Sequence, residues 1–156
     1  MDKNIAIALT GAGISKSAGI PTFQEFPDIR DKLSVYYKKS HPREFDETME
    51  TLKKNCSGKS PTKAHFALAK YKIPIITMNI DGLHSAAGTD YVLEIHGNVD
   101  KNNVVLYGQS INYADESINL VYKCGSFCKS NNIDGILIII GTSMQTQFAN
   151  YFYCSC

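Results

Sequence analysis

Short runs of branched apolar residues recur along the chain, and each is followed at once by small or polar residues. The runs at residues 5–9, 72–77, 91–95 and 136–140 are long enough for a strand and too short for a helix. The last run is wholly apolar, which is typical of a fully buried parallel strand. A shorter run at residues 104–107 predicts one further strand.

Between these runs, apolar residues recur at helical spacing. Helices are predicted from Asp28, as the cap, to about residue 39, from residue 42 to about 55, and from residue 113 to about 130. Another helix is expected to begin at Ser60 and Pro61, a capping serine followed by a proline in the first helical position. The pattern indicates an α/β protein with an open, mostly parallel sheet.

The first strand leads directly into small residues. Gly11, Ala12 and Gly13 would let the backbone approach a diphosphate, with amide N–H groups pointing at it. Ser15 adds a hydroxyl, and the helix expected from about Gly13 adds the positive end of its dipole. The spacing is not G-x-G-x-x-G, because the next glycine is Gly19, so a tight turn without a ligand remains the alternative on this feature alone.

Polar residues also follow the second and third strands. Asn79 and Asp81 come after residues 72–77, and His96 comes after residues 91–95. Ligands of open α/β sheets bind outside the carboxyl ends of the strands, although Asp81 is equally suited to cap a short helix. A histidine in such a place suits proton transfer near neutral pH. Its convergence with an Asn/Asp pair and a glycine turn on one edge favours a functional site.

Length and charge restrict the function classes. The chain has 156 residues and a formal net charge of +1, which suits a single domain over residues 1–156 and gives no sign of a nucleic-acid partner. No secretory signal is expected before the first strand, and the longest wholly apolar run is far too short to span a membrane. Five cysteines, an odd number, favour a reducing cytoplasmic setting.

The cysteines carry a weak metal hypothesis. Cys124 and Cys128 lie four residues apart on a predicted helix, and a structural zinc site needs four ligands. Cys154 and Cys156 would complete the set, but two small buried thiols on a helix is the favoured interpretation. We therefore expect no bound metal.

Four segments in order resemble the signatures of the sirtuins, the NAD-dependent protein deacylases: GAGISKSAGIPTF, MNIDGLH, EIHGN and IIIGTSMQ. They extend from about residue 5 to residue 145. The resemblance implies a Rossmann-like parallel sheet that binds NAD, with helices on both faces.

The resemblance also implies a role for each matching residue. The diphosphate would face Gly11, Ala12, Gly13 and Ser15, and the nicotinamide pocket would be lined by Ile20 and Phe23. The ribose and carboxamide would be held by Asn79, Ile80 and Asp81, with His96 as general base and Asn79 as second catalytic residue. The adenosine side would contact Gly141, Thr142 and Ser143. The acylated peptide would pair with Val104, Val105, Leu106, Tyr107 and Gly108.

The implied activity is NAD-dependent deacetylation or deacylation of protein lysines, in which the acyl group passes to ADP-ribose and nicotinamide is released. An acyl-lysine protein or peptide would be the partner. Two alternatives remain open. If water or another nucleophile accepts the ribosyl group, the protein is an NAD glycohydrolase or an ADP-ribosyltransferase. If catalysis is weak or lost, it is a module that binds NAD or ADP-ribose.

The sequence departs from the sirtuin pattern at several places. Thr22 and Gln24 stand where the family usually has aspartate and arginine, and Met78 stands where it has glutamine. Only seven residues separate His96 from Val104, where the family normally inserts a zinc module with two cysteine pairs. The chain is therefore expected to be a minimal or truncated member without the zinc module.

Overall fold

The computed structural model describes residues 6–131 and 134–144. Within this part, four strands form one parallel sheet in the order β3-β2-β1-β4. The strands are β1 (Ala6–Thr10), β2 (Ile75–Thr77), β3 (Val92–Glu94) and β4 (Ile136–Ile140). The chain winds outward from β1 to β2 and β3, then returns to place β4 on the other side of β1. This order confirms the predicted open parallel sheet.

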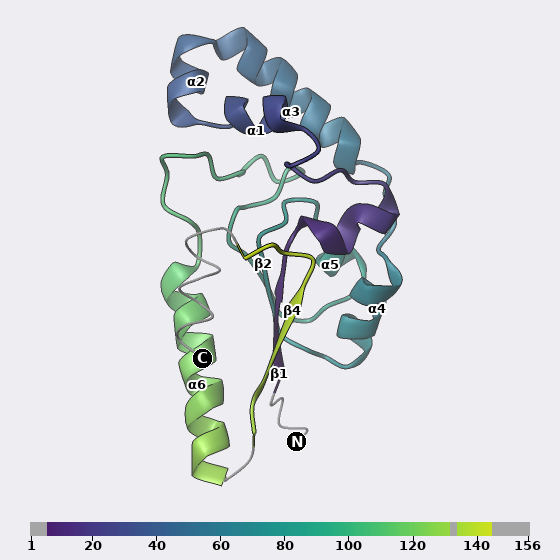
Figure 1. Cartoon of the computed structure of the whole chain (residues 1–156), viewed down its shortest axis with the longest axis vertical. Coiled ribbons are helices and arrows are strands. Elements are labelled where there is room, and N and C mark those ends of the chain that lie inside the picture. Colours follow the sequence, from purple (N-terminus) through teal and green to yellow (C-terminus); the bar gives the residue numbers. More distant parts are fainter. Residues whose placement is uncertain (1–5, 132–133, 145–156) are drawn as a thin grey trace.

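Helices cover both faces of the sheet (Figure 1). One face carries α6 (Ala114–Asn131), which confirms the helix expected over residues 113–130. The other carries the short 3-10 helix η1 (Ala12–Ala18), α4 (Lys63–Lys70) and α5 (Leu83–Ala86). Within residues 6–131 and 134–144, no helix is long and apolar enough to cross a membrane.

The alternation of side chains along β1 explains this layering. Ile7 and Leu9 belong to the buried cluster that includes Val121 of α6. Ala8, between them, belongs to the cluster formed with Ile14 and Leu68 on the opposite face. A strand that is apolar on both faces must be covered on both, which is why the second layer of helices forms.

Three further helices lie beyond the carboxyl ends of the strands (Figure 1). They are α1 (Pro27–Lys32), α2 (Val35–Ser40) and α3 (Pro42–Cys56), and they share an apolar cluster with the loops below them. The last confirms the predicted helix over residues 42–55.

The single helix expected over residues 28–39 is wrong, because α1 ends at Lys32 and α2 begins at Val35. The Ser34 hydroxyl accepts the amide of Tyr37 at 3.1 Å and caps α2. The cap of α1 is Phe26, followed by Pro27 at the first position, rather than Asp28.

Two other local expectations need correction. Thr62, not Ser60, caps α4, because His65 at the third helical position completes a capping box with it. Residues 104–107 form no strand. They make one isolated parallel bridge, between Tyr107 and Ser34.

β4 is not fully buried. Among the described residues it pairs only with β1, so it forms an edge of the sheet. Ile136 is 54% exposed and Ile139 is 36% exposed. The run of isoleucines predicts a strand correctly, but the burial of that strand depends on which elements pack beside it.

Candidate functional site

The carboxyl ends of all four described strands meet at one edge of the sheet, facing the layer of α1, α2 and α3 (Figure 1). Segment 11–23 follows β1, loop 78–82 follows β2, turn 95–99 follows β3, and turn 141–144 follows β4. The strand order reverses between β1 and β4. Such a switch point is where open α/β sheets bind nucleotides.

Glycines bring the turns after β1 and β4 into direct backbone contact. The Gly11 amide donates to the carbonyl of Ile140 at 3.0 Å, and the Gly13 amide donates to the carbonyl of Gly141 at 2.8 Å. A Cβ on Gly11 or Gly13 would lie within 2.9 Å of that same carbonyl oxygen, and one on Gly141 would overlap the nitrogen of Ile14. This contact already requires the glycines. Their role toward a diphosphate stays a prediction.

The remaining residues of the two turns lie beside this contact. Ala12 begins η1. The Cβ of Thr142 lies 2.8 Å from where a Cβ of Gly11 would be, and the Thr142 hydroxyl accepts the amide of Met144 at 3.1 Å. Ser143 is exposed next to them. The structure therefore brings the predicted diphosphate and adenosine residues together.

A buried polar cluster joins the loops after β1 and β2. The hydroxyl of Ser15 donates to Oδ2 of Asp81 at 2.6 Å, and Nδ2 of Asn79 donates to the Ser15 oxygen at 3.1 Å and to Asp81 Oδ2 at 3.3 Å. All three residues are buried, and Asp81, the most exposed of them, is 8% exposed. The other oxygen of Asp81 accepts the amide of Leu83 at 3.0 Å. Asp81 thus supports α5 and reaches the glycine loop at the same time.

His96 lies at the same edge of the sheet, just beyond β3. The amide of Ile95 donates to the carbonyl of Thr77 at 3.1 Å and so continues the register of β3 on β2. Partial burial of the His96 ring lowers its pKa below the usual value, so the ring is neutral near pH 7. A neutral imidazole at a carboxyl edge is able to accept a proton.

Glu94, which the sequence analysis did not single out, holds the turn that carries His96. Glu94 is 8% exposed, and its carboxylate accepts Nδ2 of Asn98 at 2.7 Å and Nζ of Lys101 at 2.7 Å. The amide of Val99 donates to the carbonyl of Ile80 at 2.9 Å, which joins this turn to the loop after β2. A glutamate inside the apolar run 91–95 was the available signal.

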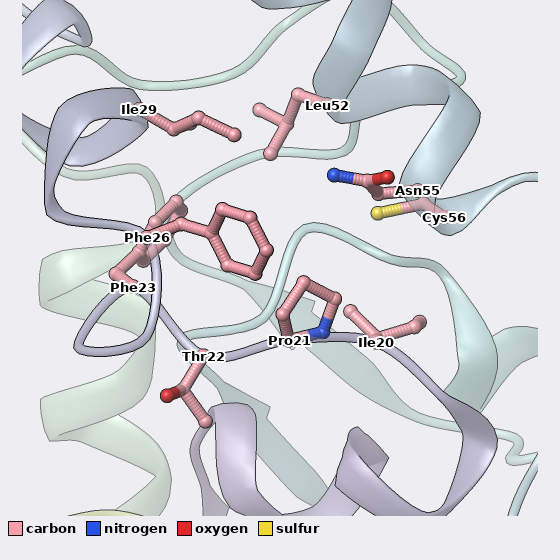
Figure 2. Close-up of a pocket in the computed structure, with 9 residues that line it drawn as sticks. All are labelled: Ile20, Pro21, Thr22, Phe23, Phe26, Ile29, Leu52, Asn55 and Cys56. Carbon is pink, nitrogen blue, oxygen red and sulfur yellow. The ribbon is translucent and has the colours of Figure 1, made fainter.

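The predicted nicotinamide residues line a small apolar hollow (Figure 2). Ile20 and Phe23 contribute to it from the loop after η1, while Leu52 and Cys56 come from α3. Burial raises the pKa of the Cys56 thiol to about 11, so it is protonated and unreactive. The free volume is about 20 Å³, enough for one water molecule and too small for a nicotinamide ring. Ile80, which was predicted to hold the ribose and carboxamide with Asn79 and Asp81, belongs to the same apolar cluster as Ile20.

The loop that carries Phe23 is closed by a carboxylate that the sequence analysis missed. Glu25 accepts the amide and the hydroxyl of Thr22 at 2.9 and 3.0 Å, and it pairs with Nζ of Lys16 at 2.8 Å. The hydrogen bond from Lys16, followed by those from Thr22, lowers the pKa of Glu25 to about 2. The threonine at the usual aspartate position therefore holds this loop as a hydrogen-bond donor.

The predicted peptide-binding segment passes close to His96. The amide of Val105 donates to the carbonyl of His96 at 2.9 Å. Tyr107 donates to the carbonyl of Leu33 at 2.9 Å and accepts the amide of Val35 at 3.1 Å. Val104 and Leu106 pack into the apolar cluster below α3, and Gly108 follows with a positive φ of 93°. Its role in binding a peptide stays a prediction.

The described residues contain no group of three or more histidine, cysteine, aspartate or glutamate side chains placed to hold a metal ion. Cys124 and Cys128 are free thiols on α6. Cys154 and Cys156, the other two candidate ligands, lie outside the described residues.

Comparison with known proteins gives consistent matches. The model of the Sir2 family matches residues 11–132. An NAD-dependent protein deacylase of Helicobacter pylori is 32% identical over 97% of this chain and 79% of that protein. An NAD-dependent protein deacetylase of Sulfolobus acidocaldarius is 39% identical over 62% of this chain. That alignment spans only 42% of the Sulfolobus protein.

Solved structures share the fold over nearly the whole chain. A complex of Sir2 with a p53 peptide and NAD+ has a TM-score of 0.80 and 26% identity, covering 96% of this chain and 75% of that one. Sir2Tm bound to a propionylated peptide has a TM-score of 0.79 and 25% identity, with the same coverage.

Proposed function

The chain belongs to the Sir2 family, the sirtuins, and from this membership we propose that it is an NAD-dependent protein lysine deacylase. It would transfer the acyl group of a modified lysine to ADP-ribose and release nicotinamide. The names of its relatives and the Sir2 complexes with NAD and with a propionylated peptide support this proposal.

The observation that carries the proposal is the buried cluster of Ser15, Asn79 and Asp81 beside the switch point. Burying a carboxylate, an amide and a hydroxyl costs desolvation energy, and apolar residues of similar volume would stabilise the fold as well or better. A hydroxyl, amide and carboxylate are the groups that recognise ribose hydroxyls and a carboxamide. The cluster therefore supports a nucleotide as ligand at this edge, and its donors and acceptors fit NAD.

NAD, when bound, supplies the ribosyl group that accepts the acyl group. The chain supplies the rest. Asn79 and Asp81 would orient the ribose and carboxamide, and the neutral ring of His96 would accept a proton from a ribose hydroxyl at a ring nitrogen. General-base help of this kind contributes about a hundred- to ten-thousand-fold to a rate. Segment 104–108, joined to His96 through Val105, would hold the acylated peptide beside that base.

Nicotinamide release tests the proposal directly. The full chain is incubated with NAD, with and without an acetyl-lysine peptide, and nicotinamide is measured over time. Release that depends on the peptide supports deacylation. Release without peptide would replace it with an NAD glycohydrolase, and binding of NAD without release would leave a cofactor-binding module.

We also propose that the chain acts as one NAD-binding domain in a reducing cytoplasm. Cys56, Cys124 and Cys128, the cysteines in the described residues, are all free thiols, which supports a reducing compartment. Measuring the free thiols of the purified full chain under denaturing conditions without reductant checks this, since five reactive thiols are expected.

A further inference from the structure

Two buried histidines lie under the carboxyl edge of the sheet, next to the candidate site but outside it. His65 of α4 is 0% exposed and His84 of α5 is 2% exposed. Their ring centroids are 4.5 Å apart, with the planes tilted by 54°. Burial lowers the pKa of both rings, that of His84 to about 3, so both are neutral near pH 7.

A chain of hydrogen bonds leads from His84 to the candidate catalytic residue Asn79. Nε2 of His84 lies 2.9 Å from the Thr10 hydroxyl oxygen. Thr10 donates to the Thr77 hydroxyl oxygen at 2.8 Å, and that oxygen accepts the backbone amide of Asn79 at 3.1 Å. Thr10 and Thr77 are opposite each other in the last paired positions of β1 and β2.

The tautomer of His65 is fixed from outside this chain of bonds. Nδ1 of His65 lies 3.2 Å from the backbone amide of Thr62, which can only donate, and 2.8 Å from the Thr62 hydroxyl oxygen, which can donate or accept. A proton on Nδ1 would point at the amide hydrogen, so the amide favours Nδ1 as an acceptor and places the proton of the neutral ring on Nε2. That buried N–H has no acceptor among the described residues.

The ring of His84 also has one buried nitrogen, Nδ1, without a hydrogen-bond partner in the described part of the chain. If it carried the proton, two neighbouring rings would each bury an unpaired donor, which is unfavourable. With Nδ1 as the acceptor, Nε2 of His84 carries the proton and donates to Thr10, and Thr10 is free to donate to Thr77.

We propose that His65 and His84 are positioning residues that fix the direction of the hydrogen bonds beneath Asn79. The amide of Thr62 favours one tautomer of His65, whose ring packs against His84, and a proton on Nε2 of His84 leaves the Thr10 hydroxyl free to donate. Thr10 then donates toward Thr77, whose lone pair holds the Asn79 amide. This keeps the side chain of Asn79 against Ser15 and Asp81. The link from these bonds to catalysis rests on the proposed function. The assignment of the two tautomers does not depend on it.

Long-range proton–nitrogen NMR of the full chain tests the tautomers without any ligand. Both His65 and His84 should be neutral at pH 7, with the proton on Nε2. The chain has four histidines, so loss of signals in single-histidine variants assigns them. A proton on Nδ1 of His84, or a charged ring at either position, would overturn the proposal.

Paired variants test the link to Asn79. Hydrogen exchange of the Asn79 amide should become about tenfold faster in His84→Leu, as expected for loss of one hydrogen bond, and stay within about threefold in His84→Gln, whose amide N–H replaces the Nε2 donor. A second pair serves if His84→Leu does not fold. Thr10→Val removes the hydroxyl and should speed the exchange, whereas Thr10→Ser keeps the hydroxyl and should not. His41→Leu, at an exposed histidine, is the control.

NAD affinity, measured by titration of the same variants, should follow the exchange rates. Equal exchange in His84→Leu and His84→Gln, or in Thr10→Val and Thr10→Ser, would refute the positioning role. If the wild-type chain fails to bind NAD while tautomers and exchange behave as expected, the proposed function fails and the hydrogen-bond arrangement stands.

Discussion

Replacing Gly141 by alanine tests the contact between the turns after β1 and β4. Gly141 has a φ of +68°, a conformation that alanine adopts with strain. Its new Cβ would overlap the nitrogen of Ile14 and lie 2.7 Å from the carbonyl carbon of Gly13. Both are backbone atoms, so no side-chain rotation relieves the overlap. The turns must separate, which breaks the hydrogen bond from Gly13 to Gly141.

The expected cost has two parts. Placing an alanine in the left-handed region costs about 1–2 kcal/mol. Losing the hydrogen bond costs about 0.5–1.5 kcal/mol more, because Gly13 is exposed and water can replace the partner, for a total of roughly 1.5–3.5 kcal/mol. Gly58→Ala is the matched control, because Gly58 has a φ of +70° and no described atom within 4 Å of its Cβ position. It should show only the first part.

Urea unfolding of both variants gives the two free energies. Gly141→Ala should lose more stability than Gly58→Ala by about 0.5–1.5 kcal/mol, the part that belongs to the contact. Its NAD affinity should also fall, while that of Gly58→Ala should not. Equal losses of stability would show that the two turns do not touch as described, and the switch point would then lose its structural basis.

Three other changes give separate tests. His96→Ala should reduce peptide-dependent nicotinamide release about a hundredfold or more while NAD titration shows little change in affinity, and surviving turnover would remove His96 as the base. Glu25→Gln should lower the melting temperature at pH 6. Because the pKa of Glu25 falls from about 4.5 to about 2 on folding, that difference should shrink as the pH drops from 4.5 to 2, and a constant difference would contradict the Lys16 contact. Asp81→Asn removes the charge that Ser15 binds and should weaken NAD binding about tenfold in a titration, whereas Asp100→Asn, at an exposed position, should not.

Elements with a strong local pattern were predicted well, because periodicity is a property of the segment itself. The first strand, α3 and α6 lie within one or two residues of their expected positions. The break between α1 and α2 was missed because Ser34 bridges to Tyr107, more than seventy residues away. The exposure of β4 was missed for a similar reason, since burial depends on neighbours that the strand's own sequence does not specify.

The candidate site was predictable to the extent that parallel strands share a carboxyl edge. That rule alone places Asn79, Asp81 and His96 at one edge of the sheet. Glu25 and Glu94, which hold the loop of Phe23 and the turn of His96, were missed because each acts through partners that only the fold brings near. The capping box of α4 was missed because a histidine takes the position where glutamate or glutamine is usual.

The glycines of the site are weaker evidence for a ligand than its polar residues are. Gly11, Gly13 and Gly141 are required by the packing of one turn on another, so they would be retained in a protein that binds nothing. The cluster of Asn79 and Asp81 has no such structural necessity, because the hydrogen bond to the first amide of α5 needs only one oxygen of Asp81, and Asn79 caps no helix. A glycine-rich turn therefore indicates the fold, and the buried amide and carboxylate beside it indicate the ligand. For that reason, substitutions at Asn79 and Asp81 separate function from folding more cleanly than substitutions at the glycines.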